Sequence, residues 1–159
     1  MFTHGGKDEA RINVMRDFIN RYNKAKKQKA FEIWEEYENN DSLFVFCIRI
    51  HKNHHKFKQF NFPEGEHTTA FPSRYYIMDG VLFYWSDTTR AVSREVFNVM
   101  KKYDAVEITN DIIVPEPDYK NSYWYLICKN NLKKYKVIKK IWIKENEFPQ
   151  LNFKCKNKI

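Results

Sequence analysis

Two runs of β-branched and aromatic residues flank the dipeptide Asp79-Gly80 near the middle of the chain. Asp and Gly tolerate the positive φ angles that a type I′ turn requires, and such a dipeptide between strand-forming runs is the strongest local hairpin signal. The pattern therefore predicts a β-hairpin over residues 74–85, and the other elements are expected to cover it.

The N-terminal part of the chain shows a helical period. Apolar residues recur every three or four positions at Ile12, Met15, Phe18, Ile19 and Tyr22 and, beyond a lysine-rich run, at Ala30, Phe31, Trp34 and Tyr37. This spacing predicts one long helix over about residues 7–38, or two helices with a bend near Lys26. A second, shorter helix is predicted from about Ser93, as its N-cap, to Tyr103.

Continuous apolar runs at residues 43–50 and 122–129 are typical of strands buried on both faces. After a turn at Asn130-Asn131, the sequence alternates between apolar and lysine positions, which predicts a half-exposed strand with a basic outer face. Shorter strands are expected at residues 57–62 and 106–108.

These elements predict a single α+β domain over residues 1–159. We expect an antiparallel sheet of about five strands, with the long N-terminal helix and the shorter helix packed mainly on one face. Residues 1–6 and about 146–159 are expected to form loosely ordered tails.

The composition supports a packed globule, since 43% of the residues are hydrophobic and 17% are aromatic. No apolar run approaches the roughly 20 residues of a membrane span. The N-terminus lacks the apolar segment of a signal peptide, so a cytoplasmic location is expected. The alternative is an exported protein or periplasmic lipoprotein domain whose signal has been removed.

The net charge of +8 is unevenly distributed, because residues 121–159 carry ten basic and only two acidic residues. Lys134, Lys136 and Lys140 share one side of the last predicted strand with Trp142, and these four residues are the candidate partner-binding site. A basic strand with interleaved aromatics also fits nucleic acid, because lysines neutralise phosphates and exposed rings stack on bases. The simpler interpretation is a lysine-rich face that prevents edge-to-edge aggregation.

Residues that could carry chemistry are sparse. Cys47 and Cys128 lie in apolar runs and are expected to be buried thiols; three cysteines argue against a disulfide framework, although one bridge with a leftover thiol stays open. The histidines at 51, 54, 55 and 67 are interpreted as solvated turn and loop residues, since supporting metal ligands are missing from their spacing. No nucleophile elbow, phosphate loop or dinucleotide fingerprint is present. We therefore expect no catalytic residues, no metal and no cofactor.

Residues 75–85 and 92–106, followed by 125–131 and Lys134-Tyr135-Lys136, resemble a pattern in small bacterial immunity proteins encoded beside secreted antibacterial toxins, and in small exported lipoproteins of similar plan. The resemblance implies no catalytic residues. It leads us to expect a non-enzymatic protein that neutralises a cognate toxin by direct contact. The alternative is a nucleic-acid-binding domain that uses the basic C-terminal third.

Overall fold

A computed structural model describes residues 5–38, 40–52, 56–59, 72–86, 94–108 and 118–155. In chain order its elements are α1 (Gly5–Arg21), α2 (Ala25–Gln28), β1 (Ala30–Glu36), β2 (Leu43–Ile48), β3 (Phe57–Gln59), β4 (Arg74–Met78), β5 (Val81–Trp85), α3 (Arg94–Lys102), β6 (Val106–Ile108), β7 (Ser122–Cys128), β8 (Asn131–Lys140) and the 3₁₀ helix η1 (Glu145–Leu151). No helix among the described residues is both long and apolar enough to cross a membrane.

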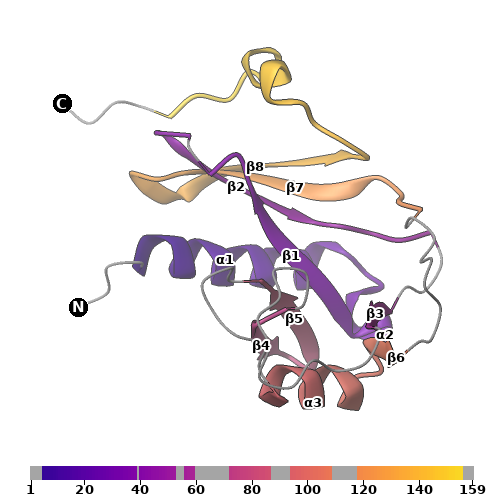
Figure 1. Ribbon diagram of the computed structural model, residues 1–159. Coiled ribbons are helices and arrows are strands. Elements are labelled where there is room, and N and C mark those ends of the chain that lie inside the picture. Colours follow the sequence, from indigo (N-terminus) through magenta and orange to yellow (C-terminus); the bar gives the residue numbers. More distant parts are fainter. Residues whose placement is uncertain are drawn as a thin grey trace.

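The main sheet has six strands in the order β4-β5-β1-β2-β7-β8 (Figure 1). Strands β1 and β5 run parallel, and every other neighbouring pair in this sheet is antiparallel. Strands β3 and β6 form a separate parallel pair. The predicted α+β class is confirmed, but the prediction of about five purely antiparallel strands is wrong, because the sheet is mixed and has six.

The sixth strand comes from a segment that was predicted to be helical. Lys29 adopts the left-handed conformation, with φ of 66°, and ends the short helix α2. The chain then continues as β1, in which Phe31 and Ile33 are buried. Its first three residues pair with β5 and its last four with β2. The aromatic and β-branched residues of this segment fit both the 3.6-residue period of a helix and the two-residue period of a strand. Pairing with a neighbouring strand on each side favours the strand.

The helices cover opposite faces of the sheet, so the prediction that both pack mainly on one face is wrong. Phe18 of α1 lies in a core cluster with Phe31 and Phe83, whereas α3 packs against Leu82 and Tyr84. Successive residues of a strand point to opposite faces, which places the two helices on different sides of β5. The C-terminal segment lies across β7 and β8 on the side away from α1 (Figure 1).

Asp17 attaches α1 to the far edge of the sheet. Its carboxylate accepts hydrogen bonds from the hydroxyls of Tyr125 and Tyr135, both at 2.8 Å, and forms an ion pair with Arg21 at 2.8 Å. Burial by itself would raise the pKa of Asp17, but the hydrogen bonds from Arg21, Tyr135 and Tyr125 outweigh it and lower the pKa. The carboxylate is therefore ionised at neutral pH and orients the helix.

Several predicted elements are confirmed within the described residues. The apolar runs form β2 and β7, residues 106–108 form β6, and α3 occupies the predicted second helix. The proposed N-cap Ser93 and residues 60–62 of the expected edge strand lie outside the described part of the chain.

A disulfide joins Cys128 at the end of β7 to Cys155 in the C-terminal segment, and Cys47 is free and buried. Of the alternatives that the sequence left open, the structure has one bridge with a leftover thiol. The expectation that Cys128 is a buried free thiol is therefore wrong.

The central hairpin is confirmed in detail. Met78 faces Val81 across the turn, and Asp79 and Gly80 have φ angles of 50° and 78°. A Cβ at Gly80 would meet no atom within 4 Å, so a substitution there tests backbone strain without a steric clash.

Gly80→Val is expected to lower the free energy of unfolding by about 1 kcal/mol or more, because a β-branched residue resists positive φ. Gly80→Asn is the matched control and should cost much less, since Asn tolerates this region. Chemical denaturation of both variants measures the difference. Equal stability of Gly80→Val and wild type would contradict the strain at this turn.

Candidate partner-binding site

The three predicted lysines of β8 lie on one face of the sheet, but the C-terminal segment covers that face. The Lys136 ammonium donates a hydrogen bond to the carbonyl oxygen of Leu151 at 2.6 Å, and Lys140 lies 3.3 Å from a carboxylate oxygen of Glu147. Lys134 lies 5.9 Å from the centre of the Phe153 ring. All three lysines are half-buried and contact the C-terminal segment, and their role in partner binding stays a prediction.

Trp142, the fourth predicted residue, remains accessible. Its side chain is 49% exposed, and that of the neighbouring Ile141 is 53% exposed. The Trp142 ring packs edge to face against buried Trp124, with ring centres 5.8 Å apart. An exposed indole held in one orientation beside an exposed aliphatic side chain is a typical anchor for a protein partner.

Arg49 supports Trp142 from below and was not recognised in the sequence as a site residue. It follows β2 and is only 5% exposed. Four aromatic rings surround its guanidinium at 4.8–5.3 Å, namely those of Trp34, Tyr119, Trp124 and Trp142. We call Arg49 and these four rings the arginine cluster. A single charged residue within an otherwise apolar run was the signal available in the sequence.

The arginine cluster is held by stacking more than by ion pairing. Arg49 donates a hydrogen bond to the carbonyl oxygen of Ile141 at 2.7 Å, and its Nε has no hydrogen-bond partner within the described part of the chain. No ion pair joins Arg49 to a carboxylate among the described residues. Burial raises the pKa of Glu36, which the attraction of Arg49 only partly offsets. The hydrogen bond to Ile141 ties the guanidinium to the exposed pair Ile141 and Trp142.

Cys47 lies on the same face of the sheet as the arginine cluster, but its thiol is unreactive. Burial raises the pKa of its thiol to about 12, so the thiol is protonated at neutral pH. A reactive cysteine needs the opposite setting, in which positive charge and exposure stabilise the thiolate. Cys47 is therefore part of the packing.

Of the four histidines considered in the sequence, His51 lies within the described residues. The His51 ring lies 4.8 Å from the Tyr119 ring, and the two residues form an isolated β-bridge. His54, His55 and His67 lie outside the described residues. The described part of the chain contains no group of three or more His, Cys, Asp or Glu that could hold a metal ion.

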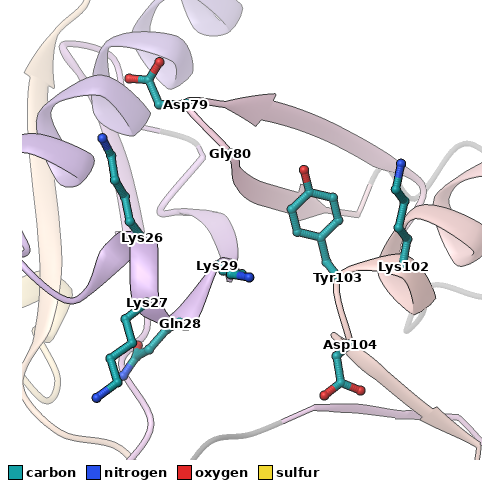
Figure 2. A pocket seen from close by; sticks show the side chains of 9 residues that line it. All are labelled: Lys26, Lys27, Gln28, Lys29, Asp79, Gly80, Lys102, Tyr103 and Asp104. Carbon is teal, nitrogen blue, oxygen red and sulfur yellow. The ribbon is translucent and has the colours of Figure 1, made fainter.

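A second basic surface surrounds a pocket of about 720 Å³ between α2, the β4–β5 turn and the end of α3. Lys26, Lys27, Lys29 and Lys102 line it (Figure 2). Figure 2 shows Lys29 extending toward Tyr103, whereas Lys27 points away from that ring. Asp104, also in the lining, is paired with Lys56 at 2.8 Å. These lysines do not converge on one point, so the pocket is a weaker candidate than the Trp142 surface.

No protein-family model, curated protein or solved structure matches this chain significantly. The site must therefore be judged on its own geometry.

Proposed function

We propose that this chain is a non-enzymatic protein-binding domain whose interface is centred on Trp142 and Ile141. The observation that carries the proposal is the half-exposed Trp142 ring, held against Trp124 and over the Arg49 guanidinium at 4.8 Å. Tryptophan is enriched among residues that dominate binding energy. A ring already fixed in position loses little conformational entropy when a partner covers it.

The partner that fits this surface is a folded protein with an acidic patch. Lys144 is exposed two residues after Trp142, within the basic C-terminal third of the chain. Positive charge around an apolar anchor accelerates association with an acidic partner, while the desolvated anchor supplies affinity. With the resemblance noted above, the most specific form of the proposal is an immunity protein that neutralises a cognate bacterial toxin.

The disulfide bears on where this binding takes place. Disulfides persist in oxidising compartments and are rare in the reducing cytosol. The bond between Cys128 and Cys155 therefore favours an exported or periplasmic location over the cytoplasmic one expected from the N-terminus. We include this location in the proposal.

Nucleic-acid binding is the second candidate function, and the lysine-lined pocket of Figure 2 favours it. Such binding would rest on phosphate contacts and would weaken steeply as salt rises. The lysines of β8 support it less than the sequence predicted, since Lys136 and Lys140 already contact the C-terminal segment.

Trp142→Ala is expected to weaken binding of the cognate toxin at least tenfold, because it removes the anchor from the centre of the interface. Candidate toxins encoded beside the gene are purified, and calorimetry compares their dissociation constants for wild type and variant. Tyr76→Ala is the matched control, since Tyr76 is 41% exposed but lies on β4 at the opposite edge of the sheet.

Equal loss of affinity in both variants would place the interface elsewhere. A pull-down from the source cells, with and without nuclease, tests the second function. Capture of nucleic acid alone, with no toxin bound by the purified domain, would overturn the protein-binding proposal.

A further inference from the structure

The two edges of the main sheet differ in the residues that they carry. Strand β8 forms one edge, and lysines occupy half of its positions (Figure 1). Charged side chains of this kind oppose pairing with another chain. Strand β4 forms the other edge with the sequence Arg-Tyr-Tyr-Ile-Met, and it pairs with β5 without a register shift. The lysines, prolines and bulges that commonly protect a sheet edge are therefore missing from β4.

The backbone of β4 directs hydrogen-bonding groups toward this open edge. Leu82 of β5 donates its N–H to the carbonyl oxygen of Lys29 at 2.7 Å, so the backbone groups of Leu82 point away from β4. Ile77 faces Leu82, and Tyr75 lies two residues before Ile77. Because hydrogen-bonded and non-hydrogen-bonded pairs alternate along antiparallel strands, the N–H and C=O groups of Tyr75 and Ile77 point outward. Within the described part of the chain, no hydrogen bond reaches these outward groups.

The side chains of β4 also leave apolar surface uncovered. Tyr76 and Ile77 are each 41% exposed. They lie on opposite faces of the sheet, because successive residues of a strand point to opposite sides. An edge strand that exposes both its backbone and large apolar side chains is a template for the addition of another strand.

The charges at the two ends of β4 favour a second copy of the chain as the added strand. Arg74 begins the strand and Asp79 follows it, and both are exposed. Antiparallel pairing of two copies brings the Arg74 end of each strand to the Asp79 end of the other. Opposite charges across two strands stabilise the pair, and a two-fold axis repeats the favourable contact. The edge of β4 is therefore complementary to itself.

We propose that two copies of this chain associate through antiparallel pairing of their β4 strands, with the two-fold axis at Tyr76. In this register Tyr75 of each copy faces Ile77 of the other, so the outward backbone groups form hydrogen-bonded pairs. The two Tyr76 side chains face each other across the axis. Trp142 follows β8, at the opposite edge of the sheet, and remains accessible in both copies. The dimer does not rest on the proposed Trp142 interface, and either can fail alone.

Sedimentation velocity over a concentration series into the high micromolar range tests the dimer. The wild type should approach twice the mass of one chain, with modest affinity because pairing of a short strand buries a small area. Ile77→Lys should weaken association by about tenfold or more, because it places a charge on the open edge of both copies. Ile141→Lys is the matched control, since Ile141 is 53% exposed and follows the opposite edge strand.

The control variant should associate as the wild type does. A wild type that stays monomeric at every concentration would overturn the proposal. Equal loss of association in Ile77→Lys and Ile141→Lys would also overturn it, because the contact would then not depend on β4.

Cysteine cross-linking tests the register. The two copies of Tyr76 form a non-hydrogen-bonded pair with Cα atoms about 4.5 Å apart, a separation that a disulfide can span. Tyr76→Cys should therefore yield a cross-linked dimer on mild oxidation with copper phenanthroline. Ile77→Cys is the matched control: Ile77 is equally exposed, but its two copies lie two residues, about 7 Å, apart along the strands. Cys47 is buried, and Cys128 is already bonded to Cys155.

Equal cross-linking of the two cysteine variants, or none in Tyr76→Cys, would overturn the proposed pairing. Thermal unfolding shows whether each variant is folded. If Ile77→Lys does not fold, the cross-linking of Tyr76→Cys decides. If the wild type stays monomeric and folded Ile77→Lys loses binding of the toxin, the open edge belongs to that partner and not to a second copy.

Discussion

Replacing both Cys128 and Cys155 with serine is expected to lower the free energy of unfolding by about 3.5 kcal/mol. The two residues are 27 positions apart, and a cross-link over a loop of this length restricts the unfolded chain by about that amount. The loop contains β8, η1 and the exposed pair Ile141 and Trp142. The bridge thus stabilises the part of the chain that carries the proposed interface.

Urea denaturation of the oxidised protein and of the double-serine variant measures this effect. Reduction of the wild type should bring its stability close to that of the variant, and the same reductant should leave the variant unchanged. Cys47 is buried and forms no disulfide, so it does not contribute to this difference. Equal stability of oxidised and reduced wild type would contradict a stabilising bridge.

Arg49→Ala is expected to lower the free energy of unfolding by about 3 kcal/mol. The change leaves a cavity among four aromatic rings and removes the stacked guanidinium, and each loss is substantial for a side chain that is 5% exposed. It also removes the hydrogen bond to the Ile141 carbonyl. The Trp142 ring would lose one of the two groups that hold it.

Arg49→Met and Arg49→Lys distinguish the causes. Met preserves most of the volume, so it should recover much of the stability if packing dominates, since no ion pair to a described residue is lost. Lys retains the charge but not the planar stack, and should recover less if stacking dominates. A thermal melt of Arg49→Ala that matches wild type would show that the arginine cluster does not hold this face together.

The arginine cluster also connects stability to the proposed function. The Arg49 guanidinium packs against the rings of both Trp142 and Trp34, so it joins the exposed surface to the buried side of the same face. If Arg49→Ala weakens toxin binding more than Tyr76→Ala while the protein stays folded, the positioning of Trp142 by Arg49 is the cause.

Local chemistry was enough to predict part of this structure. The Asp79-Gly80 turn depends on the φ angles of two residues, so its hairpin is predictable from the dipeptide and its flanks. The runs that became β2 and β7 are apolar at nearly every position, and the register shows that these strands lie inside the sheet. The stripe of α1 is periodic over several turns. In each case the signal lies within one continuous segment of the chain.

The remaining features depend on contacts between distant segments. The pattern of residues 30–36 fits a helix or a strand, and pairing with β2 and β5 stabilises the strand. Because the pairing with β5 is parallel, the sheet is mixed. The alternation of apolar and lysine residues in the sequence places three lysines of β8 on one face. That the C-terminal segment covers them is visible only in the folded structure. Cysteine spacing could not choose between a bridge and free thiols, because bridging requires the two side chains to meet. A pocket of about 340 Å³ lies where β1 and β5, which are distant in sequence, stop pairing, and no local period encodes that point.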